Sequence, residues 1–157
     1  MVEAAAAYVA DVRDYRGFDE KEGWRHGVAH GADWLMQLAL NPALDREQLD
    51  RILAAVAVQV VPEAPHAYVF GEPGRLARPV LHAASRGLHT QAEWQAWLSA
   101  LAPRVATGGK TYSDLAWLAR KHDLDAFLAA LYLEADRSND EAIRQLKPAI
   151  LAAMKQS

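Results

Sequence analysis

The sequence contains no cysteine, and this absence excludes several kinds of chemistry. The chain can form no disulfide, no thiolate nucleophile and no cysteine-ligated zinc site. Any metal ion would have to be held by histidine and carboxylate side chains. The sequence also lacks a run of lysine and arginine, and its formal net charge is −3. Nucleic-acid binding therefore lacks its usual electrostatic basis, and we expect no nucleic-acid partner.

Glycine and proline are both sparse, with 9 and 7 residues, while hydrophobic residues make up 52% of the 157. This composition predicts one folded domain over residues 1–157. The N-terminal residues do not form a signal peptide, because Glu3 and Asp11 interrupt their apolar part. Residues 23–41 are almost long enough to span a bilayer, but Arg25 and Asp33 would each cost about 2.5–3.5 kcal/mol there. We expect a cytoplasmic protein without a membrane partner.

Apolar residues recur at helical spacing along most of the chain, and no segment is a convincing strand. Two capping boxes, Asp45 with Gln48 and Thr90 with Glu93, mark helix starts. Thr111 with Asp114 starts a later helix, and the pattern leaves open whether that helix is broken at 122–123. It predicts an all-α fold, an irregular α-α superhelical (HEAT-like) array of about seven or eight helices. These helices are expected over residues 2–13, 23–41, 45–61, 72–86, 90–102, 111–121, 124–136 and 138–156, the last capped by Ser138 and kinked at Pro148.

The helix expected over residues 23–41 carries a single polar line. At about 100° per residue, His26, His30, Asp33 and Gln37 fall on one face of this helix, and the other faces are apolar or small. A helix that is apolar on nearly all sides is normally buried. We therefore expect these polar side chains to be buried and to have partners inside the protein.

The polar line has two interpretations. In the first, His26 and His30 lie one helical turn apart and bind a divalent metal, with Asp33 as a third ligand or as a group that orients them. In the second, which we favour, the three side chains form a buried hydrogen-bond network that holds neighbouring loops. A zincin-like protease is not indicated, since no carboxylate lies between the two histidines.

Several neighbouring residues complete this candidate pocket. Arg16 is predicted to pair with Asp33, or Glu72 with one of the histidines; alternatively, Arg16 and Arg75 form a fork for a bound anion. Asp14 lies beside Arg16 in the sequence, and Trp24, with Trp34, flanks the polar line. Either tryptophan would wall a pocket, although a core position is the stronger expectation. Gly27 and Gly31 have the spacing that permits close approach of another helix or loop.

Two catalytic motifs are absent. The segment A-T-G-G-K-T (106–111) lacks the first glycine of a phosphate-binding loop and follows no strand. No serine lies in the G-x-S-x-G context of a hydrolase nucleophile.

Three segments together resemble one known family. They are D-Y-R-G-F-x4-G-W-R-H-G-V-A-H-G-A-D (14–33), Y-V-F-G-E-P-G-R-L-A (68–77) and A-R-K-H-D-L-D-A-F-L-A-A-L-Y-L (119–133). They resemble a bacterial family catalogued as domain of unknown function 2785. The resemblance implies an α-α, HEAT-like architecture and no established activity. It also implies that this chain matches the C-terminal part of longer members, and it places His-Asn where this chain has His122-Asp123.

Two functions therefore remain open, and the residues do not decide whether the protein is an enzyme. The first is a binding or scaffold module with a buried His/Asp cluster, whose partner is an unidentified protein or small molecule. Such a module could form a homo-oligomer through the N-terminal helix. The alternative is a pocket protein, a hydrolase among the options, that holds a divalent metal or small ligand at His26, His30 and Asp33.

Overall fold

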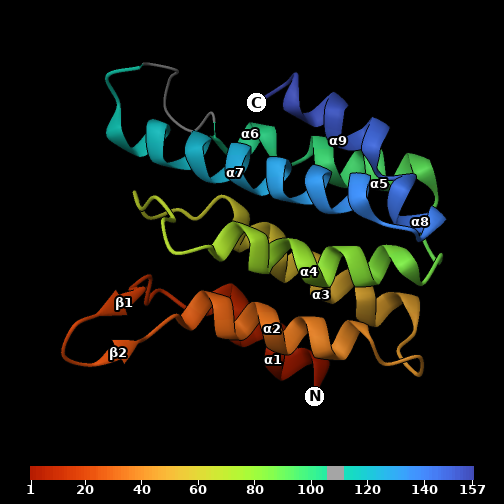
Figure 1. Ribbon diagram of the computed structural model, residues 1–157, viewed down its shortest axis with the longest axis horizontal. Helices are drawn as coiled ribbons and strands as arrows, with labels where there is room; N and C mark the ends of the chain where they lie inside the picture. The colour runs from red at the N-terminus through yellow and green to blue at the C-terminus, as the bar shows by residue number, and fades with distance from the viewer. Residues whose placement is uncertain (106–111) are drawn as a thin grey trace.

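The computed structural model describes residues 1–105 and 112–157, and helices dominate this part of the chain (Figure 1). The predicted all-α class is confirmed. The segment A-T-G-G-K-T lies outside the described residues. Two of the described helices, α6 and α8, are single turns of four residues. The helices are α1 (Val2–Asp11), α2 (Gly27–Ala39), α3 (Arg46–Val60), α4 (Glu72–Ser85), α5 (Gln91–Ser99), α6 (Ala102–Val105), α7 (Leu115–Arg137), α8 (Glu141–Arg144) and α9 (Lys147–Met154).

The helices stack in three layers (Figure 1). Helices α1 and α2 form the first layer, α3 and α4 the second, and α5, α7 and α9 the third. Helix α1 packs on α3, α2 packs on α4, and α4 in turn packs on α7. Consecutive helices also pack within the first two layers, α1 on α2 and α3 on α4, whereas a HEAT-like superhelix stays a prediction.

The layers share one apolar core. Each layer contributes large side chains that are fully buried, among them Leu35, Ile52, Leu76, Phe127 and Ile150. Burying apolar surface stabilises the fold by about 25 cal/mol per Å² removed from water. None of the described helices is both long and apolar enough to span a membrane.

The start of α2 differs from the prediction. The predicted helix begins at Gly23, but residues 18–24 form a hairpin in which β1 (Phe18–Asp19) pairs antiparallel with β2 (Gly23–Trp24). Gly23 has a φ of +76°, which ends any helix there. The helix begins at Gly27, and the expectation of no strand is wrong for this short hairpin. The prediction failed because helical periodicity contains no information about hydrogen bonds between two strands.

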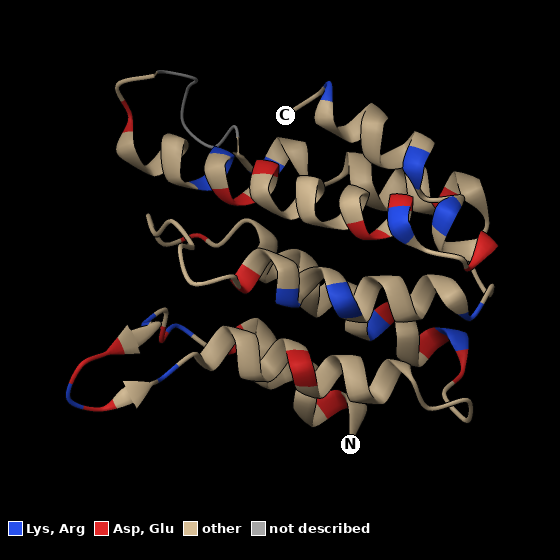
Figure 2. Ribbon diagram, in the orientation of Figure 1, with Lys and Arg blue, Asp and Glu red and all other residues tan. Residues whose placement is uncertain are grey.

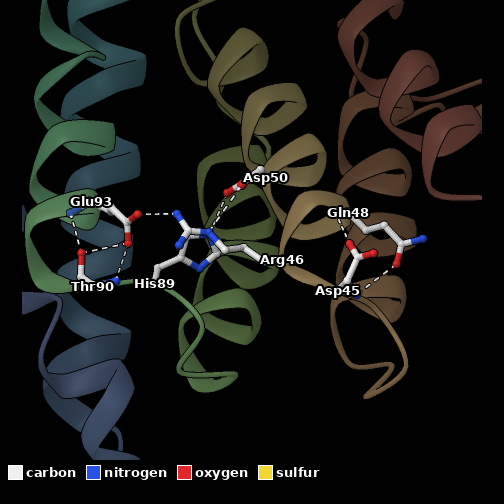
Figure 3. A network of polar contacts seen from close by, with 7 residues as sticks. All are labelled: Asp45, Arg46, Gln48, Asp50, His89, Thr90 and Glu93. Carbon is white, nitrogen blue, oxygen red and sulfur yellow. Dashed lines mark hydrogen bonds and ion pairs between the residues drawn. The ribbon is translucent and has the colours of Figure 1, made fainter.

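Both capping boxes are present (Figure 3). The side chain of Asp45 accepts a hydrogen bond from the Gln48 backbone N–H, and the Gln48 side chain accepts one from the Asp45 N–H. Thr90 and Glu93 repeat the arrangement at α5. These contacts satisfy backbone donors that a helix N-terminus leaves free.

The same helix starts are joined across the layers (Figure 3). Arg46 at the start of α3 bonds to the carboxylate of Glu93 in α5. His89 Nε2 lies 2.7 Å from Asp50 Oδ1. Hydrogen bonds from Thr90, with Arg46, lower the pKa of Glu93 to about 2, so this carboxylate stays ionised at neutral pH. We therefore interpret this network as a structural link between α3 and α5.

The C-terminal helices also differ in detail. Helix α7 continues without a break through His122 and Asp123. The predicted Ser138 cap is wrong, because Asp140 caps α8 by accepting from the Ala142 N–H. Pro148 kinks no helix. It lies in the first turn of α9, where its missing N–H removes no intrahelical bond.

Gly31 brings α1 and α2 into close contact, which confirms the prediction from its spacing with Gly27. A Cβ atom on Gly31 would lie 2.7 Å from Val9 Cγ2 and 3.0 Å from Tyr8 Cε1, both in α1. Val9 is fully buried, so close packing leaves its side chain little room to shift. The absence of a side chain at Gly31 therefore sets the distance between the two helices.

We predict that Gly31→Ala destabilises the protein by about 1–3 kcal/mol, because the added methyl group overpacks this interface. Gly74→Ala is the matched control, since a Cβ on Gly74 meets nothing within 4 Å. This control should be neutral or stabilising by up to about 1 kcal/mol through helix propensity. Urea unfolding measures both changes. Equal stability of the two variants would contradict the close packing.

Candidate functional site

His26 has a backbone conformation that is rare for a residue with a side chain. It is the N-cap of α2, with φ +38° and ψ +43°, in the left-handed region. The hairpin holds it there: its N–H donates to the Arg16 carbonyl at 3.0 Å, and the Arg25 N–H donates to the Gly17 carbonyl at 2.9 Å. Such conformations cost about 1–3 kcal/mol and persist where the surroundings enforce them.

The His26 side chain is buried against Glu72. Its Nε2 atom lies 3.4 Å from Glu72 Oε1, and the Glu72 side chain is only 2% exposed. Glu72 Oε2 also accepts the Phe70 backbone N–H at 2.9 Å. Glu72 therefore lies beside a histidine as predicted, but His26 Nε2 forms no hydrogen bond among the described residues. The contact brings the start of α2 next to the start of α4.

The rest of the polar line is not buried as predicted. His30 and Gln37 are exposed, and Asp33 is half-buried. Asp33 forms ion pairs with Arg75 and, at 3.6 Å, with Arg78. The expectation failed because the neighbouring helices α1, α3 and α4 cover other faces of α2 and leave this line at the surface.

The predicted metal ligands are only partly brought together. The rings of His26 and His30 lie 6.3 Å apart, whereas Asp33 is held by arginines. In residues 1–105 and 112–157, no group of three or more histidine or carboxylate side chains is placed to hold a metal ion. The metal site at His26, His30 and Asp33 stays a prediction.

The predicted anion fork of Arg16 and Arg75 has its charges already paired. Arg16 binds Asp14 with two hydrogen bonds of 2.7 and 2.8 Å, and this contact lowers the pKa of Asp14 to about 2. Arg75 binds Asp33 instead. Arg16 therefore does not pair with Asp33 as predicted, and each of the two arginines has its own carboxylate.

Sequence reasoning missed a buried polar group that organises this end of the molecule. The Oδ1 atom of Asp123 in α7 accepts the Tyr68 backbone N–H at 2.8 Å, and His122 Nε2 lies 3.2 Å from the Tyr68 carbonyl. We call these contacts the Asp123 clamp. They fix the irregular segment 63–71 between α3 and α4. The only sequence signal was the pair His122-Asp123, which stands where the resemblance implies His-Asn.

The clamp continues through the core to the first layer. The Tyr68 hydroxyl donates to Gln59 Oε1 at 3.0 Å, and burial raises the pKa of this hydroxyl, so that it keeps its proton. The side-chain amide of Gln59 donates to the carbonyls of Val9 and Val12 at 2.6 and 3.0 Å. A chain of hydrogen bonds therefore links α7, segment 63–71, α3 and α1.

Burial raises the pKa of Asp123 to about 7. Its side chain is fully buried, and its Oδ2 atom has no hydrogen-bond partner among the described residues. The nearby charge of Glu72 also raises the pKa, while the Tyr68 N–H and His122 lower it. The clamp therefore titrates close to neutral pH.

Sequence reasoning also missed a set of exposed apolar side chains around the hairpin, three aromatic and one aliphatic. Phe18, Trp24, Val69 and Phe70 are 51%, 57%, 69% and 41% exposed, and we call them the hairpin patch. The rings of Trp24 and Phe18 lie 5.3 Å apart, and those of Trp24 and Phe70 lie 6.0 Å apart. The core position expected for Trp24 is therefore wrong. The paired strands, which periodicity did not reveal, place it at the surface.

The N-terminal helix has an exposed apolar face as well. Small side chains of α1 and α3 line a shallow groove, among them Ala6, Ala7, Ala10, Ala54 and Val58. The predicted homo-oligomer through this helix stays a prediction.

Comparison with known proteins places the chain in a family. It belongs to the family described as protein of unknown function (DUF2785), whose model matches residues 1–133. The match ends within α7, and the resemblance found in the three sequence segments is confirmed. Neither a curated protein nor a solved structure gives a significant match to the chain.

We predict that Asp123→Asn stabilises the protein more at pH 8 than at pH 4.5. The folded pKa of about 7 lies above the ordinary value of 3.8, so between these values the unfolded chain binds fewer protons. The free energy of unfolding should therefore fall as pH rises from about 4 to 7, by on the order of a few kcal/mol. Asparagine keeps the acceptor for Tyr68 and removes the charge.

Urea unfolding at both pH values measures this effect. Asp125→Asn is the control, because Asp125 is half-exposed on the same helix and pairs with Lys121 at 3.0 Å. A destabilisation by Asp123→Asn of equal size at both pH values would contradict the raised pKa.

Proposed function

We propose that the protein is a protein-binding module whose hairpin patch enters an apolar groove on its partner. One observation carries this proposal: Phe18, Trp24, Val69 and Phe70 gather at one end of the helical stack and are all more than 40% exposed. Exposed aromatic clusters of this kind mark interaction sites, and aromatic residues dominate the binding energy of many interfaces.

The patch is held in place before any partner binds. Phe18 and Trp24 are directly paired across the two strands. The Phe70 ring lies over Gly17, where a Cβ atom would come within 1.9 Å of it. Aromatic side chains with only two rotatable bonds and fixed neighbours lose little conformational entropy on binding.

The charged residues of the hairpin turn lie next to the patch, and their sign predicts the charge at the edge of the partner's groove. The turn of the hairpin carries Asp19, Glu20 and Glu22 around a single lysine, Lys21, as Figure 2 shows. Asp19 accepts the backbone N–H groups of Lys21 and Glu22, both at 2.9 Å, and these bonds lower its pKa. Arg25 balances the charge of Glu22 at 2.9 Å, so Asp19 and Glu20 with Lys21 leave the turn one excess negative charge. This charge favours a basic rim on the groove of the partner.

The alternative function, a metal or small-ligand pocket at His26, His30 and Asp33, has less support. His26 is engaged with Glu72 and Asp33 with Arg75, so two of its three residues already have charged partners. No observation on the described residues favours hydrolysis at this cluster.

We predict that the double variant Phe18→Ala, Trp24→Ala folds normally and loses binding. Both side chains are more than half exposed, so their removal should change the free energy of unfolding little. The loss of two aromatic anchors should weaken binding by at least about 30-fold. Leu133→Ala is the control, because Leu133 is 46% exposed on α7.

The partner is first identified by a photo-crosslinking residue placed at position 69, with position 133 as the reference. The purified partner is then titrated against wild type, the double variant and Leu133→Ala by calorimetry. Equal affinity of all three proteins, or adducts at position 69 that also form at position 133, would refute the proposed surface.

A further inference from the structure

A cleft of about 370 Å³ opens between α2, α4, α7 and α8, away from the hairpin patch. Its apolar lining comes from three different helices: Met36 from α2, Leu81 from α4 and Ile143 from α8. A volume of this size is within the usual range for small-ligand sites. It corresponds to a flexible molecule of about ten non-hydrogen atoms, since one water molecule occupies about 30 Å³.

The polar lining of the cleft has an excess of positive charge. Arg78 and Arg137 contribute two positive charges and Glu134 one negative charge, which gives a local charge of +1 in a chain whose net charge is −3. Burial and the neighbouring Arg78 lower the pKa of His82, so this imidazole is neutral at pH 7. It can still donate or accept a hydrogen bond.

The charge of Arg78 is only partly balanced inside the protein. Its nearest carboxylate is Asp33, at 3.6 Å, which is beyond the usual length of a hydrogen bond. Asp33 forms its closer contact with Arg75. One carboxylate is therefore shared by two guanidinium groups, and Arg78 keeps donors for a further anion.

We propose that this cleft binds a small amphipathic monocarboxylate. The carboxylate lies between the guanidinium groups of Arg78 and Arg137, which offer forked donors suited to its geometry. The apolar body of the ligand packs on Met36, Leu81 and Ile143. A single negative charge matches the local charge of +1. This site is separate from the protein-binding surface proposed above and does not depend on it.

Three probe molecules test the proposal, because they carry the apolar chain and the negative charge together or separately. Octanoate carries both the apolar chain and the charge, octan-1-ol carries the chain without the charge, and acetate carries the charge without the chain. Each is titrated into the full chain at pH 7.5 while the methyl signals of Met36 and Ile143 are followed by NMR. We expect saturable shifts with octanoate and at least about tenfold weaker binding of the other two probes.

Variants at the rim give changes of opposite sign. Arg137→Gln should weaken octanoate binding by about tenfold, because it removes a charge-assisted hydrogen bond. Glu134→Gln should tighten binding, since it removes the negative charge that repels the ligand. Arg144→Gln is the control, because Arg144 is exposed on α8 and lines a different cavity. Arg137 and Glu134 are exposed too, so all three variants should fold.

Any of three results would overturn the proposal. One is the absence of saturable shifts at Met36 and Ile143 with octanoate. Another is equal binding of octanoate and octan-1-ol, which would show that the charge is not recognised. The third is an effect of Arg144→Gln as large as that of Arg137→Gln, which would show attraction by surface charge alone. The double variant at Phe18 and Trp24 should bind octanoate like wild type.

Discussion

The hydrogen bond from the Tyr68 backbone N–H to the Asp123 carboxylate fixes the route of the chain between α3 and α4. Segment 63–71 has no regular secondary structure, so its buried backbone groups need partners from elsewhere. Without one, a buried donor costs about 1–3 kcal/mol. Through the Tyr68 hydroxyl and Gln59, the same contact reaches the carbonyl of Val9 in α1. One carboxylate in the third layer thereby sets the position of a loop that packs against the first.

Residues 68–72 combine this structural function with the proposed binding function. Tyr68 points into the core, Val69 and Phe70 are exposed, and Glu72 is buried beside His26. Because the buried side chains of Tyr68 and Glu72 hold the backbone on both sides of Val69 and Phe70, this exposed pair has little freedom to reorient. The left-handed backbone of His26 holds the hairpin from the other side. The patch is therefore preorganised by the core, and binding should cost little additional ordering.

The sequence predicted a helix start correctly where the residues that form the motif are also the residues that make the contact. The capping boxes at Asp45 and Thr90 are examples, because each box lies within four consecutive positions. The start of α2 could not be predicted in this way. It depends on pairing between residues 16–18 and 24–26, which helical periodicity does not encode. The same limit applies to His30 and Asp33, since periodicity identifies a face of a helix but not the neighbour that covers it.

Burial was also misjudged where composition could not distinguish a core aromatic residue from an exposed one. Phe18 and Trp24 belong to a two-stranded hairpin, which has no second layer to cover both of its faces. Leaving a large apolar side chain in water forgoes about 1.5–3 kcal/mol that its burial would provide. The Trp24 ring lies 4.5 Å from the His26 ring, so part of this side chain supports the fold. The exposed parts of Phe18 and Trp24 are in contact with water and add nothing to the core. A partner that covers Phe18, Trp24 and Phe70 would recover this free energy on binding, and this favours an interface at the hairpin over a purely structural one.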